Sequence, residues 1–169
     1  MGILILAVVT LPLLTALFLK VANRFLNELL TNFITINAAL LSVAVSFFMF
    51  GYLLLDKFKP IKFELFEWYP SPQIIFEFYL DGLSGVMMIL ISGLSLVIQL
   101  FSTSYMSKDE KYTKYFEYFN FFVFSMLLLV LSGNFLVMFF GWELVGLSSY
   151  LLISFWYEKN SAAKAGNKA

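Results

Sequence analysis

The chain has 169 residues, of which 61% are hydrophobic and 13% are charged, and its mean hydropathy is +0.86. Soluble domains carry roughly 25% charged residues, so this composition excludes an ordinary soluble protein and indicates an integral membrane protein. The formal net charge is zero, and the chain contains no Cys, no His and no basic run that would suggest nucleic acid as a partner. Thiolate-bound iron–sulfur clusters, disulfides and imidazole-bound zinc or haem are therefore excluded as well.

Uncharged runs of about 20 residues predict membrane-spanning helices, because that length crosses the hydrocarbon core of a bilayer. We expect an all-α transmembrane fold, with residues 1–169 forming a single membrane domain. The first run lacks the basic leader and the cleavage site of a signal peptide, so it is predicted to remain in the membrane. Five runs are found, near 3–19, 33–55, 82–101, 118–132 and 135–156.

A small β-hairpin is predicted near 61–80, between the second and third helices. Apolar and polar residues alternate on both sides of the segment Tyr69-Pro70-Ser71-Pro72. A two-stranded unit is marginally stable alone, so its apolar face needs a cover. Either the helix ends of this chain or a neighbouring subunit could provide that cover, and the sequence favours neither.

The connections that follow carry local signals. Asp81 is predicted to cap the third helix, with a proton-entry role as the less favoured alternative. The segment 102–117 mixes charges with aromatic residues that settle at headgroup depth, which predicts an interfacial loop. Ser132-Gly133-Asn134 predicts a tight turn, so the fourth and fifth helices should pack as an antiparallel pair.

The distribution of basic residues predicts the orientation in the membrane. The connections after the first, third and fifth helices lie on one side, and acidic residues outnumber basic ones on the other side. By the positive-inside rule, the N-terminus should face outward and the C-terminus inward. The basic residues on the inward side are Lys20, Arg24, Lys108, Lys111, Lys114, Lys159, Lys164 and Lys168.

Glu143 is the principal candidate for a functional site, because it lies in the middle of the fifth apolar run. A charge at that depth costs roughly 2.5–3.5 kcal/mol on insertion scales. At helical spacing, Glu143 shares a face with Gly146, and this face is expected to point into protein, with Gly141 and Gly146 as helix-packing residues. The other residues on the face are Phe139, Leu147 and Tyr150.

Two explanations of Glu143 remain open from the residues alone. It is either a permanently protonated group that holds helices together, or it exchanges protons by pairing with a lysine and separating from it. Every Lys and Arg of this chain lies in a predicted loop. The second explanation, which we favour, therefore requires a lysine from another polypeptide.

Several segments resemble the N-terminal part of NADH–ubiquinone oxidoreductase chain 5, the antiporter-like subunit of respiratory complex I. They are Tyr105-Met106-Ser107, residues 120–130 (NFFVFSMLLLV), residues 139–153 (FFGWELVGLSSYLLI) and Phe155-Trp156-Tyr157. The resemblance implies a partial antiporter-like fold in which Glu143 corresponds to the helix-five glutamate that pairs with a helix-seven lysine. It also implies a subunit of a proton-translocating NADH:ubiquinone reductase in the mitochondrial inner membrane, with the N-terminus toward the intermembrane space and the C-terminus toward the matrix.

The resemblance carries further expectations about cofactors and partners. NADH, flavin, iron–sulfur clusters and ubiquinone are expected on other subunits, with no cofactor or metal held by this chain. Family members continue beyond Lys168-Ala169 into a sixth helix, so a split or shortened form is expected, with 161–169 as the lead-in to that helix. The expected partners are a second polypeptide, other membrane-arm subunits and lipids. The alternatives are a subunit of a multisubunit sodium/proton antiporter and a scaffold without a proton role.

Overall fold

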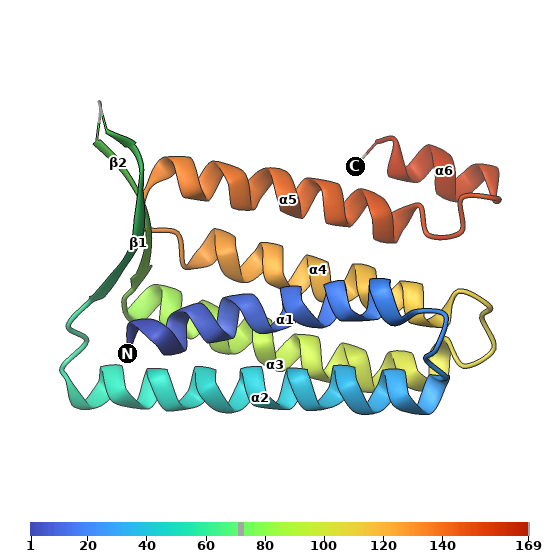
Figure 1. Cartoon of the computed structure of the whole chain (residues 1–169), viewed down its shortest axis with the longest axis horizontal. Coiled ribbons are helices and arrows are strands. Elements are labelled where there is room, and N and C mark those ends of the chain that lie inside the picture. The colour runs from blue at the N-terminus through green and yellow to red at the C-terminus, as the bar shows by residue number, and fades with distance from the viewer. Residues whose placement is uncertain (71–72, 169) are drawn as a thin grey trace.

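The computed structural model describes residues 1–70 and 73–168, which form a bundle of long helices with a two-stranded sheet across one end (Figure 1). A short sixth helix lies at the other end. The expected helical membrane fold with a small hairpin is therefore confirmed. The elements are α1 (Gly2–Ala22), α2 (Glu28–Leu55), β1 (Ile61–Pro70), β2 (Gln73–Leu80), α3 (Gly82–Tyr105), α4 (Tyr112–Val130), α5 (Phe135–Ile153) and α6 (Asn160–Gly166).

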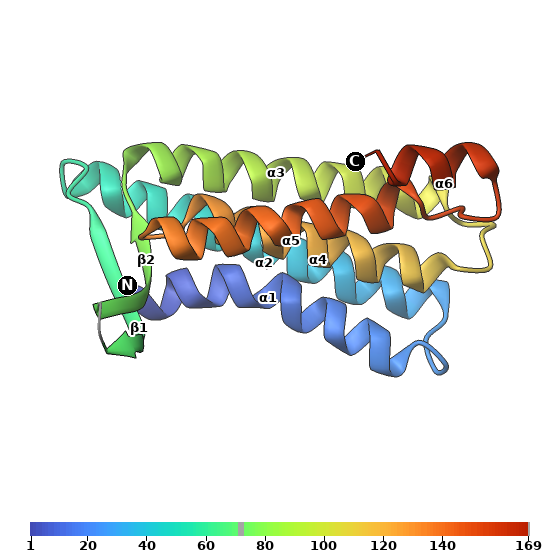
Figure 2. The same ribbon diagram turned by 90° about the horizontal axis from the view of Figure 1, so that it is seen from above.

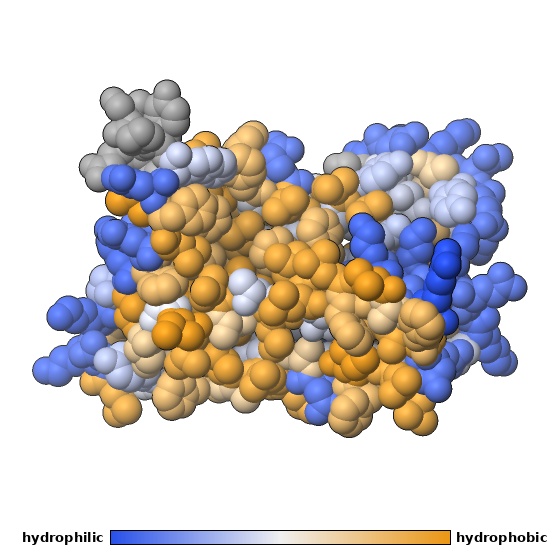
Figure 3. All heavy atoms as spheres, viewed as in Figure 1, coloured by the Kyte–Doolittle hydropathy of each residue, from blue (hydrophilic) through white to orange (hydrophobic). Residues whose placement is uncertain are grey.

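The two ends of the bundle differ in charge. The end that carries β1 and β2 is called the hairpin end, and the opposite end, with the connections 23–27, 106–111 and 154–159, is called the basic end. Apolar residues dominate the surface between them in the view of Figure 3, and hydrophilic residues gather at both ends. This distribution is the one that a bilayer requires, with an apolar belt between two polar ends.

Within the described residues, four helices, α1, α2, α3 and α5, are long and apolar enough to cross a membrane. The fourth predicted span corresponds to α4, which lies among them and packs against α1 and α5 (Figures 1 and 2). Its predicted start at 118 was wrong, because α4 begins at Tyr112. Tyr112, Phe116, Phe119 and Val123 are buried along one face, so tertiary packing extends the helix into the segment that was expected to be a loop.

Smaller differences appear at the other helix ends. The helix α2 begins at Glu28, where the side chain of Asn27 accepts a hydrogen bond from the Leu30 amide at 2.8 Å. Conversely, α5 ends at Ile153, three residues before the predicted end. Helix ends lie at headgroup depth, where polar caps are compatible with the surroundings, so hydropathy alone does not define them.

The hairpin packs on the helix ends of its own chain, which is the first of the two alternatives that the sequence left open. β1 and β2 are antiparallel, and Phe78 and Leu80 are buried in the core. The Tyr79 amide donates to the Leu131 carbonyl at 2.8 Å, and the Gly133 amide donates to the Glu77 carbonyl at 2.9 Å. Ser71 and Pro72 of the predicted turn lie outside the described residues.

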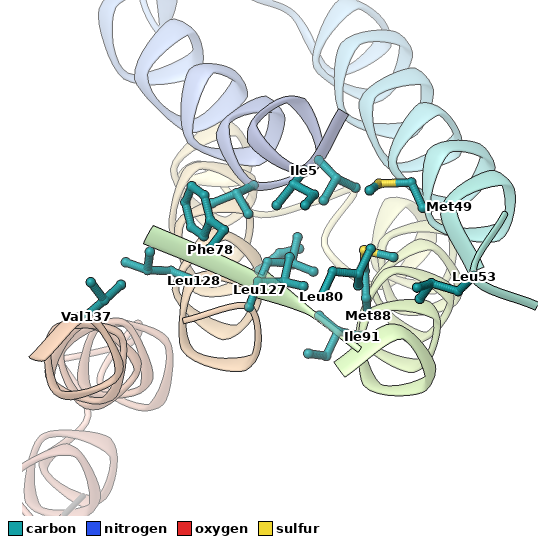
Figure 4. Close-up of a cluster of buried hydrophobic side chains, with 14 of the residues drawn as sticks. Ile5, Met49, Leu53, Phe78, Leu80, Met88, Ile91, Leu127, Leu128 and Val137 are labelled. Atoms are coloured by element: carbon teal, nitrogen blue, oxygen red, sulfur yellow. The ribbon is translucent and has the colours of Figure 1, made fainter. Parts of the chain in front are cut away.

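The main core lies where the hairpin meets the helices (Figure 4). Side chains from α1, α2, α3, α4, α5 and β2 meet there, so the sheet and the bundle share one apolar cluster. Within it, Val137 connects α5 to Leu128 of α4, which supports the predicted antiparallel pair of these two helices. The residues labelled in Figure 4 are Ile5, Met49, Leu53, Phe78, Leu80, Met88, Ile91, Leu127, Leu128 and Val137.

At the basic end, the connections around α4 and α5 are joined by polar contacts. Lys111 Nζ donates to Glu158 Oε1 at 2.8 Å, and Trp156 Nε1 donates to Asp109 Oδ2 at 2.8 Å. The hydrogen bond to Glu158 holds the pKa of Lys111 above its usual range. These contacts keep the segment after α5 against the start of α4.

Candidate functional site

The start of α5 is fixed by Asn134, which joins the helix to the hairpin. Its side-chain oxygen accepts from the Val137 amide at 3.0 Å, and its Nδ2 donates to the Ile75 carbonyl at 2.7 Å. The first bond caps the helix, since the first amides of a helix have no internal partner. The second sets where α5 begins relative to β2, and therefore the depth at which Glu143 lies.

One side of α5 packs on α4. Val137, Gly141 and Ser148 are buried on this side, and Leu144 and Leu152 pack against the main core. A Cβ atom added at Gly141 would lie 2.7 Å from both Cα and N of Leu129. Glycine is thus required at this position, because only its absent side chain lets the two backbones come this close.

The opposite side of α5 carries Glu143 and is exposed. A Cβ atom at Gly146 would meet nothing within 4 Å. The large apolar residues of this side, Phe139, Leu147 and Tyr150, are 56%, 49% and 42% exposed. We name Phe139, Glu143, Gly146, Leu147 and Tyr150 the Glu143 face. The sequence predicted that it points into protein, whereas within residues 1–70 and 73–168 this face is exposed.

Glu143 has no charge partner in the part of the chain that the structure describes. No ammonium or guanidinium group there lies within ion-pair distance of its carboxylate. Glu143 is the ninth of the 19 residues of α5, midway between the two polar ends of the bundle. An ionised carboxylate at such a depth in a bilayer needs a cation or hydrogen-bond donors that come from elsewhere.

Asp81 acts as the cap that the sequence predicted. Its side chain accepts from the Ser84 amide at 2.8 Å, and Ser84 Oγ accepts from the Asp81 amide at 2.8 Å. This reciprocal arrangement is a capping box at the start of α3. No group of three or more His, Cys, Asp or Glu suited to a metal ion occurs within the described ranges.

A second carboxylate on a long helix was missed by sequence reasoning. Glu117 was placed in a loop, but it lies in α4, where it is half-buried and interacts electrostatically with Lys20 and Lys114. Tyr112, Phe116 and Phe119, which are all buried, have the i, i+4, i+7 spacing of one helix face. This spacing could have shown that the helix begins before Glu117.

Two models of known protein families match separate parts of this chain. Residues 68–116 match the family model of the N-terminus of NADH-ubiquinone oxidoreductase (complex I) chain 5. Residues 132–169 match the transmembrane model of NADH:quinone oxidoreductase and the Mrp antiporter.

Individual relatives extend the match to nearly the whole chain. NADH-quinone oxidoreductase subunit L of Buchnera aphidicola is 36% identical over 164 residues, which cover 96% of this chain and 27% of the relative. NADH-ubiquinone oxidoreductase chain 5 of Allomyces macrogynus is 36% identical over 167 residues, which cover 97% of this chain and 26% of the relative. The chain thus spans about a quarter of the length of these relatives.

A solved structure shares the fold. The membrane-bound sulfane sulfur reductase, an archaeal respiratory membrane complex, matches 99% of this chain and 33% of its own matched chain, with a TM-score of 0.85 and 20% identity. At this level of identity the similarity concerns the fold alone.

Proposed function

Because this chain belongs to the family of NADH-ubiquinone oxidoreductase chain 5 and NADH-quinone oxidoreductase subunit L, we propose that it forms the N-terminal part of a proton-translocating subunit of complex I. In this proposal the chain is one subunit of the membrane arm, where it helps to couple quinone reduction to proton pumping. It acts in the mitochondrial inner membrane, with the basic end toward the matrix and the hairpin end toward the intermembrane space.

The observation that carries the proposal is the exposure of Glu143 on the side of α5 that faces away from α4. Gly141 fixes α5 on α4, so the opposite side is left to present the carboxylate at mid-membrane depth. A carboxylate that only held these helices together would lie on the packed side. Its position instead suits a group that meets a partner from outside residues 1–169.

The partner in this proposal is a lysine. While the Glu143 carboxylate lies beside it, the lysine ammonium is stabilised, so the proton affinity of the lysine is high. When the two groups separate, the proton affinity of the lysine falls and the proton leaves. Movement of charge along the membrane arm would drive this cycle. The prediction that the lysine is on a second polypeptide stays a prediction.

The redox chemistry of the proposed complex takes place on other subunits. The chain contains no Cys and no His, the residues that hold iron–sulfur clusters. We assign NADH, flavin, iron–sulfur clusters and ubiquinone to those subunits. The role of this chain is thus electrostatic: it presents Glu143 and the face around it.

The test is Glu143→Gln in the intact complex, which keeps the shape and the hydrogen-bonding capacity of the side chain but removes its charge. We expect NADH oxidation and quinone reduction to continue while the number of protons pumped per electron pair falls. The matched control is Glu64→Gln, because Glu64 is an exposed carboxylate on β1, outside the helices. An unchanged pumping stoichiometry in Glu143→Gln would refute the proposal.

A sodium/proton antiporter subunit is the second candidate, since the family model for residues 132–169 includes the Mrp antiporter. Purification of the native complex distinguishes the two, because only the respiratory complex carries flavin absorbance. The third candidate, a scaffold without a proton role, predicts that Glu143→Gln is silent while substitutions that block helix packing are damaging.

A further inference from the structure

A groove of about 610 Å³ runs between α1 and α5, with α4 as its floor. Its apolar walls come from all three helices and include Leu13, Leu17, Phe121, Leu147 and Leu151. The volume lies within the range of roughly 300–1,000 Å³ that is typical of ligand-binding pockets. Most of the groove therefore offers an apolar surface to an elongated apolar group.

The charged residues of the groove gather at its basic end. Lys20 lies in the last turn of α1, Lys114 lies in the first turn of α4, and Glu117 follows one turn later. Both lysines are free of ion pairs with the described residues, and Lys114 Nζ lies 5.6 Å from the centre of the Tyr118 ring. Together with Glu117 they leave one net positive charge at headgroup depth.

We propose that this groove binds one acidic phospholipid from the leaflet at the basic end. Its phosphate lies between Lys20 and Lys114, and one acyl chain follows the apolar walls past Phe121. Ammonium groups bind phosphate as point charges, and basic pockets between membrane helices on the inward side suit acidic lipid headgroups. A headgroup with one phosphodiester, as in phosphatidylglycerol, matches the net charge of the site.

The arrangement of charges favours a lipid over a protein helix. The lysines, Glu117 and the polar Asn23 lie at the end at headgroup depth, whereas the lining farther along the groove, from Leu13 and Leu17 to Phe121 and Leu147, is apolar. A lipid has this same division into a charged head and an apolar chain. The site depends only on the membrane location of the bundle and holds whether or not Glu143 moves protons.

The exposed side of α2 provides an internal comparison. It bears a shallower apolar hollow of about 480 Å³, lined by Phe47, Phe48, Leu54 and neighbouring residues without any charge. Bulk lipids would contact this side equally, whatever their headgroup. Selectivity for the acidic headgroup is therefore expected in the groove but not on α2.

The experiment uses the intact complex in nanodiscs that contain phosphatidylglycerol or phosphatidylcholine with a photoreactive group on the acyl chain. After illumination, labelled peptides are identified by mass spectrometry. We expect several-fold more labelling of the groove residues, such as Phe121 and Leu151, with phosphatidylglycerol than with phosphatidylcholine. Labelling of Phe47 and Phe48 should be the same with both lipids.

Two kinds of variant test the binding of the headgroup and the binding of the acyl chain separately. Replacing Lys20 and Lys114 by Gln should reduce groove labelling to the level seen with phosphatidylcholine, and Lys108→Gln, a charge loss outside the groove, should leave it unchanged. Leu17→Trp fills the groove without a change of charge and should reduce labelling with both lipids. If either lysine variant fails to assemble, Leu17→Trp and the comparison of lipids still test the proposal.

Two results would overturn the proposal. Equal labelling of the groove with both lipids would show that the groove does not select an acidic headgroup. Labelling of α2 with none in the groove would show that protein from outside the described residues fills it instead.

Discussion

Gly141 and Glu143 are two residues apart on α5, yet Gly141 is buried against the backbone of Leu129 while Glu143 is exposed on the other side of the helix. Each residue of an α-helix turns by about 100°, so two residues place these side chains on nearly opposite sides. The contact at Gly141 thereby decides the direction in which Glu143 points. This relationship links the packing of the chain to the proposed function.

Gly141→Ala should disturb the pairing of α5 with α4. The added Cβ would lie 2.7 Å from Leu129 Cα, and backbone atoms cannot move aside as a flexible side chain can. Overpacking of this kind costs about 1–3 kcal/mol. We expect a lower melting temperature of the purified complex, measured by scanning fluorimetry. Gly93→Ala is the control, because a Cβ there meets nothing within 4 Å, and a shift of the same size in both variants would contradict the prediction.

Gly146→Leu should damage assembly rather than the fold of this chain. A Cβ at Gly146 meets nothing within 4 Å, so the larger side chain costs little within the described residues. If a further helix packs on the Glu143 face, however, leucine at this position blocks its approach. We expect less mature complex on native gels. Gly93→Leu, also at an open helical position, should assemble normally, and normal assembly of Gly146→Leu would mean that nothing docks there.

Asn134 should stabilise the chain through two separable hydrogen bonds. Asn134→Asp keeps the acceptor that caps α5 but loses the donor to Ile75, and Asn134→Ala loses both. The cap contributes about 1 kcal/mol and the second bond about 0.5–1.5 kcal/mol. The melting temperature should therefore fall in the order wild type, Asp variant, Ala variant. Equal values for the two variants would mean that the cap contributes nothing.

The two ends of the bundle should face different compartments. Because the chain has no Cys, single cysteines introduced at Glu64 and Lys108 give this subunit unique labelling sites. Both positions are away from the helical segments, at the hairpin end and the basic end. In intact mitochondria with a permeable outer membrane, an impermeant maleimide should label Glu64→Cys only. In inverted inner-membrane vesicles it should label Lys108→Cys only. The reverse labelling pattern would show that the chain has the opposite orientation in the membrane.

The hairpin illustrates how far the sequence leads and where it stops. Approximate alternation of apolar and polar residues predicted both strands, since a period of two is a local property. The sequence did not decide what covers the apolar face, because the partners Leu131, Gly133 and Asn134 are more than 50 residues from most of β2 along the chain. Such contacts follow only from the way in which the helices assemble.

The start of α4 shows a second limit. Lys114 and Glu117 looked like loop residues by hydropathy, which averages over all sides of a helix. In the structure, Tyr112, Phe116 and Phe119 are buried on one side, and this packing keeps the charged residues helical. The groove at Lys20 and Lys114 could not be predicted for the same reason, since it joins residues almost a hundred positions apart.

The sequence by itself determined the membrane location, the number and rough position of the long helices, the hairpin and the carboxylate at mid-depth. Each of these follows from composition or from a short-range period, which a chain carries whatever its partners. Only the tertiary structure decided which side of α5 is packed and which carries Glu143 outward, because that choice depends on the contact between Gly141 and Leu129. Close packing is a property of two surfaces that meet, and one segment of sequence describes only one of them.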